Sequence, residues 1–288
     1  MPADDTIDVP FLRQAKGVPV SSGDPLEGFR PDVPSPARMY DYFLGGKDHY
    51  PVDREAGEKV IATMPPGAIR NGARQNRDFL GRATRYLVGE VGIRQFVDIG
   101  AGLPSMNSVH EIATAMAPES RIVYVDNDPV VIAHGREMLQ GVDQAIIIRR
   151  DLRDPDGIMA DEQLRQTLDL DQPVAVLLLA ILHFIHDDED PRGIVERLLA
   201  PLPSGSHLVI SHGSADRHPE MDEAVRAYRA ATGRARPRSH QEISELLSGL
   251  DLVDPGLVWL PRWRPDGDTE VHDDPGGTLG YAAVARKP

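Results

Sequence analysis

The stretch Phe96-Val97-Asp98-Ile99-Gly100-Ala101-Gly102-Leu103-Pro104 decides the fold class of this chain. Residues 95–99 form a short apolar run with the length and composition of a buried β-strand. The run ends at Gly100 and Gly102, and glycine lets the backbone turn tightly and approach a ligand closely. The stretch therefore predicts a strand that leads into a ligand-binding turn.

The chain that follows alternates between strands and helices. Further strands are predicted at residues 121–125, 145–148, 174–179 and 207–211, and helices at 108–117, 129–139, 161–168 and 191–200. This alternation predicts an α/β fold in which helices cover both faces of a parallel sheet. Two helices at 219–231 and 239–247 and two strands at 257–260 and 279–285 complete it. The loop 261–277, rich in Gly, Pro and Asp, is predicted to be mobile.

The chain before the first strand has a different character. Residues 1–36 are rich in proline and predict an extended, partly disordered arm. Helices are predicted at 37–44, stopped by Gly45-Gly46, at 53–62, capped by Asp53, and from Asn71 onward. The sequence thus divides into an arm (1–36), a helical preface or lid (37–92) and an α/β domain (93–288).

Composition narrows the class of protein. The 288 residues include 31 basic and 45 acidic side chains, a net charge of −14. This balance argues against a nucleic-acid partner, since phosphate binding requires a concentrated basic face. The chain has no cysteine, which removes disulfides and thiolate chemistry. No secretory signal and no membrane-spanning run is visible, so we expect a cytoplasmic protein without a membrane partner.

Acidic residues lie at or just after the ends of the first three predicted strands. Asp98 closes the first strand, Asp126-Asn127 follows the second and Asp151-Leu152 the third. Ligands of open parallel sheets bind beyond the carboxyl ends of the strands, so these residues are expected to share one site. The dinucleotide-binding motif has a third glycine at the position where this chain has Ser105, which argues against a dinucleotide ligand. The carboxylate of Asp98 is suited to a ligand that carries an ammonium group. S-adenosylmethionine has both an ammonium group and a ribose.

At this point the chain resembles a known class of enzymes. Asp98–Gly102, Tyr124–Pro129 and Arg150–Leu152 are similar to the motifs of class I S-adenosylmethionine-dependent methyltransferases. Residues 35–47 (SPARMYDYFLGGK), Asn76-Arg77 with Phe79-Leu80, and 96–104 resemble, more narrowly, a bacterial S-adenosyl methyltransferase family once filed as a domain of unknown function. The resemblance spans residues 35–285. It implies a Rossmann-like, seven-stranded, mostly parallel sheet with the last strand antiparallel, and S-adenosyl-L-methionine as cofactor, but no substrate.

The cofactor residues are assigned as follows. Asp98, Gly100 and Gly102 are expected to hold the methionine part, Asp126 with Asn127 the ribose, and Asp151 with Leu152 the adenine. The alternative for Asp98 and the two glycines is a purely structural turn. The alternative for Asp126 is an acid that caps a helix, and for Asp151 and Leu152 it is an ordinary solvated loop. Pro104 stands where the general class often has a third glycine, so the start of the next helix should be less open.

Two histidines end neighbouring strands and are candidates for catalysis. A neutral imidazole at His183 or His212 has a pKa suited to taking a proton from an oxygen or nitrogen acceptor. The alternative for each is a structural histidine with satisfied hydrogen bonds. His183-x-x-His186-Asp187-Asp188-Glu189 also has the composition of a metal site. We predict no metal, because Asp190-Pro191 already explains this segment as a helix start.

The family signature in the N-terminal helices carries a further prediction. Arg38, Tyr42, Gly45, Gly46 and Lys47 are expected to form a lid over the cofactor and the acceptor pocket. A docked helix with a glycine stop is the alternative. Asn76 and Arg77 could bind the carboxylate of the cofactor, or Arg77 could be a surface ion pair.

Three functions remain open from the sequence. The first is methyl transfer to an oxygen, nitrogen or carbon atom of a small molecule. The second is a non-catalytic or regulatory protein that binds an S-adenosyl ligand. An NAD(P)-dependent oxidoreductase is the third, disfavoured by Asp98 and Ser105. The sequence predicts neither the acceptor nor the oligomeric state.

Overall fold

The fold is built on one sheet of eight strands. The computed structural model describes residues 29–105, 107–267 and 278–288. The strands are β1 (Gln95–Ile99), β2 (Arg121–Asp126), β3 (Ala145–Arg149), β4 (Ala175–Leu179), β5 (His207–Gly213), β6 (Asp251–Leu252), β7 (Val258–Trp259) and β8 (Gly280–Arg286). Their order is β3-β2-β1-β4-β5-β8-β6, with β7 also paired to β8. β1 to β5 are parallel, and β8 runs antiparallel to β5.

The seven predicted strands and the antiparallel last strand are confirmed, and β6 is an addition. β6 has two residues and pairs with the end of β8 through Asp251 and Leu252. Both residues are exposed, so they lack the alternating burial that makes a strand visible in a sequence.

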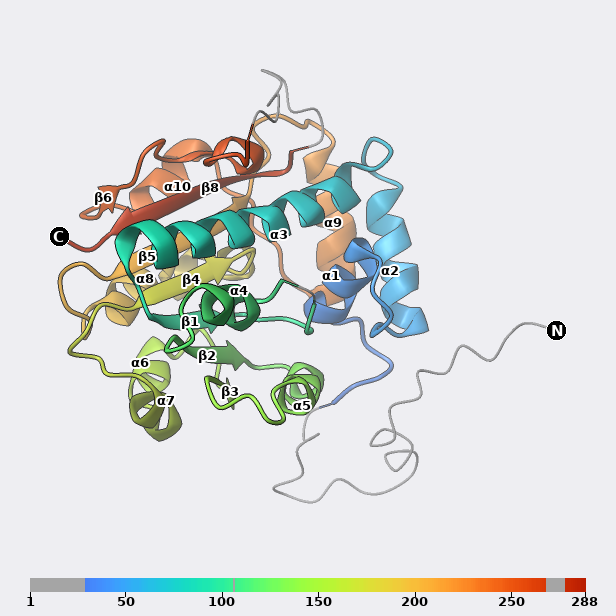
Figure 1. Ribbon diagram of the computed structural model, residues 1–288. Helices are drawn as coiled ribbons and strands as arrows, with labels where there is room; N and C mark the ends of the chain where they lie inside the picture. The colour runs from blue at the N-terminus through green and yellow to red at the C-terminus, as the bar shows by residue number, and fades with distance from the viewer. Residues whose placement is uncertain (1–28, 106, 268–277) are drawn as a thin grey trace.

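Alternate residues of the strands face two separate cores. Val97 and Ile99 of β1 pack with α6 (Pro155–Met159), α7 (Glu162–Thr167), α8 (Pro191–Leu199) and α10 (His240–Leu246). Phe96 of the same strand packs on the opposite face, with α3 (Ala68–Tyr86), α4 (Val109–Met116) and α5 (Pro129–Met138). Figure 1 shows α3 running across the front of the sheet. The strands are apolar on both faces for this reason.

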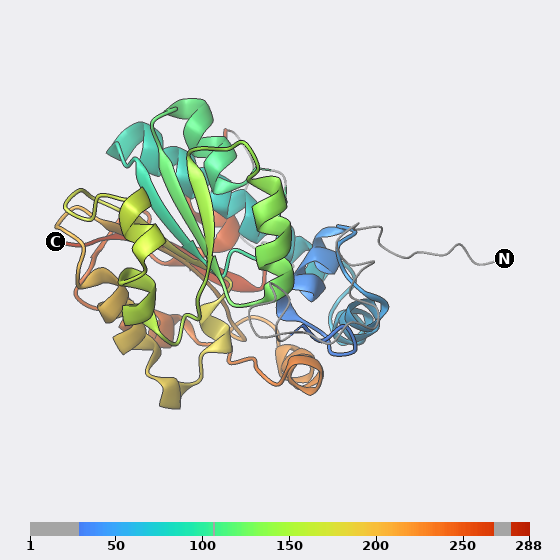
Figure 2. The same cartoon turned by 90° about the horizontal axis from the view of Figure 1, so that it is seen from below.

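The N-terminal helices form a third packed unit beside the sheet. α1 (Pro36–Leu44) and α2 (Pro51–Ile61) pack with the first turns of α3 and with α9 (Met221–Thr232), through apolar side chains such as Met39, Val60 and Met221. Figures 1 and 2 show α1 and α2 on the same side of the sheet as α9. α3 continues into a π-helical turn, η1 (Leu87–Val91), that ends at Gly92. The helical preface is therefore present; residues 1–28 of the predicted arm lie outside the described residues.

The predicted caps of α4, α5 and α8 are correct, whereas α3 begins at Ala68, three residues before the predicted Asn71, and the short helix α6 was not predicted. Asp128 and Asp190 accept backbone N–H groups at the starts of α5 and α8, and Ser108 forms a capping box with Glu111. α2 begins earlier than predicted, after Tyr50, so Asp53 is not its N-cap. The short 3₁₀ turns η2 (Leu182–Phe184), η3 (Asp187–Glu189) and η4 (Leu260–Arg262) complete the list of elements.

The loop 261–277 is anchored at its first residues. Trp263 is fully buried, and its ring lies edge-on to Phe79 and Tyr86 at centroid distances of 5.4 and 5.7 Å. The prediction of a mobile loop is wrong for this part, because a tryptophan excluded from water fixes its backbone. Residues 268–277 lie outside the described residues. Within the described ranges, no helix combines the length and apolarity needed to cross a membrane.

Candidate functional site

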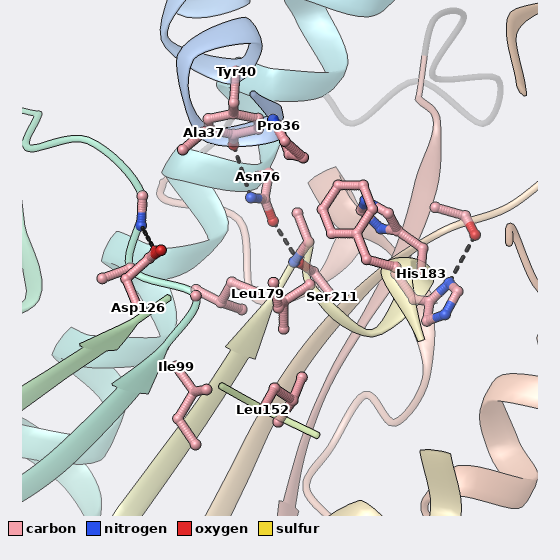
Figure 3. A pocket seen from close by; sticks show the side chains of 18 of the residues that line it. Pro36, Ala37, Tyr40, Asn76, Ile99, Asp126, Leu152, Leu179, His183 and Ser211 are labelled. Carbon is pink, nitrogen blue, oxygen red and sulfur yellow. Dashed lines mark hydrogen bonds between the residues drawn. The ribbon is translucent and has the colours of Figure 1, made fainter. Parts of the chain in front are cut away.

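A cavity of about 450 Å³ opens at the carboxyl ends of the parallel strands. Residues after β1 to β5 line one side, and residues of α1, α3 and α9 line the other. Figure 3 shows side chains from strands and from the N-terminal helices converging on it. This is the position at which open α/β sheets bind ligands.

Asp98 presents an unpartnered carboxylate to this cavity. The side chain is 6% exposed and accepts no hydrogen bond from the described residues. Burial raises its pKa to about 7, against the nearby positive charge of Arg77. A buried carboxylate without a partner is costly, so the site favours a ligand group that carries positive charge.

The two glycines after Asp98 take the conformation predicted for a tight turn. Gly100 and Gly102 have φ values of 76° and 67°, in the left-handed region. A Cβ on Gly100 would lie 2.7 Å from the Ile181 side chain, whereas a Cβ on Gly102 would meet no atom within 4 Å. Gly102 therefore leaves open space beside the cavity.

Asp126 both lines the cavity and holds the glycine turn. Its Oδ2 accepts the Gly102 N–H and its Oδ1 accepts the Asp128 N–H, both at 2.9 Å. Figure 3 draws the first of these bonds. Burial raises the pKa of Asp126 to about 6, in spite of these bonds. Each oxygen keeps a second lone pair, so hydroxyl groups of a ligand can still be bound.

Asn127, Asp151 and Leu152 lie side by side at the ends of β2 and β3. The Asn127 side chain donates to Asp151 at 2.9 Å, and Arg153 Nε donates to the same carboxylate at 2.8 Å. Burial opposes ionisation of Asp151, but hydrogen bonds from Arg153 and Asn127 lower its pKa to about 2. Leu152 is buried and lines the cavity. An ionised acid beside an apolar side chain can contact both the edge and the face of a base.

The two candidate histidines differ in their hydrogen bonds. His212 is buried, donates from Nδ1 to the Gly213 carbonyl at 2.8 Å and accepts at Nε2 from Arg238 at 3.1 Å. Burial and the neighbouring His183 lower its pKa well below the usual value. Both ring nitrogens are occupied, which fits the structural alternative for His212.

His183 has the free imidazole of the pair. Its Nδ1 is buried without a hydrogen-bond partner in the described part of the chain, and its ring lies 5.8 Å from that of His212. Burial, with a smaller contribution from the Arg238 charge, lowers its pKa to about 4. The imidazole is therefore neutral and keeps a lone pair at physiological pH.

The acidic residues after His183 form ion pairs with arginines. Asp187 accepts from Arg236 and Arg238, and Glu189 accepts from Arg234. Across residues 29–105, 107–267 and 278–288, no group of three or more His, Asp or Glu side chains is arranged to hold a metal ion. These ion pairs hold the loop after β4, which carries His183, against the segment that contains the three arginines.

Three predicted lid residues, Arg38 and Tyr42 of α1 and Lys47 after it, are not among the described residues that line the cavity. Arg38 is 2% exposed and pairs with the fully buried Asp53 at 2.7 Å. The Tyr42 hydroxyl bonds to Glu58, and Lys47 is exposed. Arg38 and Tyr42 therefore bond within the helical preface, and Lys47 lies on its surface.

The two glycines of the signature have separate structural reasons. Gly45 ends α1 in the left-handed conformation, with a φ of 84°. Gly46 lies against Asp41, whose side chain would stand 1.9 Å from a Cβ at this position. Neither requires a moving lid, and the lid stays a prediction.

Asn76 and Arg77 of α3 do line the cavity. Asn76 donates to the Tyr40 hydroxyl at 2.8 Å and accepts from the Ser211 hydroxyl at 2.5 Å, so it joins α1 to the end of β5. The Arg77 side chain donates to the Asn107 carbonyl at 3.2 Å. Both the nitrogen and the oxygen of the Asn76 amide are hydrogen-bonded to the protein, so this side chain connects the N-terminal helices to the sheet.

Sequence reasoning missed several lining residues. Tyr40 lies within the recognised stretch 35–47 and could have been selected from it. Phe184 and Tyr228 carry no motif, and only the fold brings α9 next to the loop after β4. Ser35 also lines the cavity, and its hydroxyl donates to Asp128 at 2.6 Å.

Comparison with known proteins gives the family. The sequence profile described as S-adenosyl methyltransferase matches residues 27–288. The chain belongs to the S-adenosyl methyltransferase family. A crystal structure of a DUF574 family protein from Streptomyces avermitilis is 45% identical, with a TM-score of 0.85 over 90% of this chain and 100% of that one. A candidate methyltransferase from Thermobifida fusca is 34% identical, with a TM-score of 0.84 over 89% of this chain and 97% of that one.

A curated relative matches over a shorter stretch. Demethylspheroidene O-methyltransferase of Cereibacter sphaeroides is 36% identical over 94 residues, 32% of this chain. The match covers 24% of that protein, so this chain spans about a quarter of its length.

The residues present fit S-adenosyl-L-methionine, the cofactor of this family. The unpartnered carboxylate of Asp98 matches an ammonium group, and the remaining lone pairs of Asp126 match a pair of hydroxyls. The left-handed turn with open space at Gly102 lets a ligand approach the backbone. These three features face one cavity.

Proposed function

We propose that this protein transfers a methyl group from S-adenosyl-L-methionine to an oxygen, nitrogen or carbon atom of a small molecule. The observation that carries the proposal is the unpartnered Asp98 carboxylate, which shares a cavity with the glycine turn and Asp126. Family membership supports the reaction type. The absence of nucleic-acid partners and the cytoplasmic location stay predictions.

The residues of the chain bind and align the reactants in this proposal. The cofactor supplies a methyl carbon on a positively charged sulfur, and the electron pair of the broken bond stays on that sulfur. Asp98 holds the ammonium group, Asp126 with Asn127 holds the ribose, and Asp151 with Leu152 borders the adenine. In-line displacement at an activated methyl depends mainly on proximity and alignment.

Transfer of label tests the reaction itself. Purified protein is incubated with methyl-labelled cofactor and metabolite extracts of bacterial cells, and products are separated by chromatography. We expect a labelled small molecule whose formation is abolished in Asp98→Asn and retained in His134→Phe, a substitution in α5 away from the cavity lining. Binding of the cofactor without transfer to any fraction would favour the non-catalytic alternative.

A further inference from the structure

The part of the cavity beyond β4 and β5 differs from the part that holds the acids. α1, α2, α3, α9 and the loop after β4 surround it. Its walls are largely apolar and are formed by Phe43, Val60, Ile69, Ala73, Phe184 and Leu279. Apolar walls with a few polar groups select the shape of a ligand and the position of its polar atoms.

Most polar groups on these walls already bond to one another. Tyr40 donates to the Ala73 carbonyl at 3.1 Å and accepts from Asn76, which in turn accepts from Ser211. This chain of bonds joins α3, α1 and β5. It leaves the side chains little capacity to hold a ligand.

Two polar groups remain available. The His183 ring has no hydrogen bond to the described residues, with Nδ1 buried, and the Tyr228 hydroxyl has none either among residues 29–105, 107–267 and 278–288. Phe184 contacts both rings: its centroid lies 4.2 Å from that of His183, edge to face, and 5.9 Å from that of Tyr228, stacked at 23°. His183, Phe184 and Tyr228 therefore form one aromatic wall.

No unpaired charge accompanies this aromatic wall in the described structure. Arg238 donates to His212 and to Asp187. Burial, with a smaller contribution from the Arg238 charge, lowers the pKa of His183 and keeps its ring neutral. Burial raises the pKa of Tyr228, so its hydroxyl stays protonated. Arg234, which also lines the cavity, is paired with Glu189 at 2.6 Å. A charged ligand would lose its hydration here without gaining a partner.

We propose that the aromatic wall binds a flat, uncharged, hydroxylated ring compound as methyl acceptor, with the acceptor hydroxyl donating to His183 and a second oxygen accepting from Tyr228. This inference rests on the proposed function. Aromatic side chains favour flat rings by stacking and edge contacts. As the hydroxyl oxygen bonds to the methyl carbon, its proton passes to the free lone pair of His183 and then to water. A neutral imidazole of low pKa suffices, because the oxygen becomes strongly acidic as the new bond forms.

Three ring compounds of one shape test the class of ligand. 2-Naphthol, naphthalene and 2-naphthoate are titrated at pH 7.5, by their fluorescence, into the protein with and without saturating S-adenosylhomocysteine. We expect 2-naphthol to bind about tenfold more tightly than either of the others, since one satisfied hydrogen bond is worth about 1.4 kcal/mol. Equal binding of naphthalene, tighter binding of 2-naphthoate, or no binding of 2-naphthol would overturn the inference.

Two variants locate the contact. His183→Phe keeps the ring wall and removes the hydrogen-bond acceptor, so the preference for 2-naphthol over naphthalene should fall about threefold or more. Tyr228→Phe should leave that preference unchanged, because 2-naphthol has no second oxygen, and should instead lower the affinity for 2,7-dihydroxynaphthalene relative to 2-naphthol about threefold or more. His134→Phe should preserve both preferences. Binding of S-adenosylhomocysteine checks the fold of each variant. If that ligand fails to bind the wild-type protein, the proposed function is wrong; if it binds and 2-naphthol shows no preference, only the acceptor inference is wrong.

Discussion

The carboxylate of Asp126, at the end of β2, accepts the backbone N–H of Gly102 at 2.9 Å. The acid that we assign to the ribose therefore also holds the turn that we assign to the methionine part of the cofactor. The second oxygen of Asp126 accepts the Asp128 N–H at the start of α5. Asp126 thus joins the end of β2 to the turn after β1 and to the start of α5.

The pH dependence of cofactor binding should follow Asp98. Its pKa is about 7 in the ligand-free protein, and only the ionised carboxylate can pair with an ammonium group. Affinity for S-adenosylhomocysteine should fall up to tenfold for each pH unit below 7 and level off above it. Asp126, with a pKa of about 6, strengthens the decline at lower pH. Calorimetric titrations from pH 5.5 to 8.5 measure this, and Asp98→Asn should remove the step near pH 7.

The same carboxylate should make the ligand-free protein less stable at high pH. A folded-state pKa raised from 3.8 to about 7 gives a stabilising contribution that is complete below pH 4 and is lost as the pH rises to about 7. Asp98→Asn should therefore raise the free energy of unfolding at pH 8 by about 1–2 kcal/mol relative to wild type, while at pH 4 the two should be closer. Urea denaturation at both pH values measures the difference. A variant that is less stable at pH 8 would contradict the assignment of Asp98 as a costly buried charge.

The two glycines of the turn should respond differently to alanine. Gly100→Ala places a Cβ 2.7 Å from Ile181, so the fold should lose about 2 kcal/mol or more through strain and crowding. Gly102→Ala meets no protein atom and should cost about 1 kcal/mol from its positive φ alone. Its larger effect should be on ligand affinity, because the methyl enters the space beside the cavity. Thermal unfolding and calorimetry on both variants separate the two effects; equal affinities for wild type and Gly102→Ala would show that the ligand does not approach this turn.

The buried ion pair of the helical preface should matter for stability. Asp53 accepts from Arg38 Nε at 2.7 Å and from the backbone N–H groups of Ser35 and Tyr50. Asp53→Ala leaves a buried guanidinium without its partner and should cost about 3–5 kcal/mol. Lys59→Ala, which removes an exposed pair with Glu55, should cost less than about 1 kcal/mol. Chemical denaturation compares the two; similar losses would contradict a structural role for Arg38.

The sequence predicted the sheet well because its strands are buried on both faces. Phe96 and Val97 face different cores, so the strand is a continuous apolar run, and such runs are visible without an alignment. The sequence also predicted that the acids and glycines at the strand ends share one cavity. This prediction rests on topology, because the carboxyl ends of parallel strands meet at one edge of the sheet.

Other features depend on contacts between distant segments. The buried partner of Arg38 is Asp53, which lies 15 residues further along the chain, and the sequence did not predict this pair. The occupied nitrogens of His212 depend on Arg238, which lies 26 residues further along the chain. Tyr228 reaches the cavity only through the packing of α9 against α2 and beside the loop after β4. No local pattern carries this information.

Binding of cofactor by Asp126 tests the central claim most directly. We propose calorimetric titration of wild type and Asp126→Ala with S-adenosylhomocysteine, with its 2′,3′-dideoxy analogue and with NAD. The wild type should bind S-adenosylhomocysteine at least about tenfold more tightly than the dideoxy analogue, and Asp126→Ala should bind the two almost equally, since the variant lacks the hydroxyl acceptor. Tight binding of NAD with no response to the S-adenosyl ligands, or a dideoxy penalty that persists in Asp126→Ala, would contradict the account.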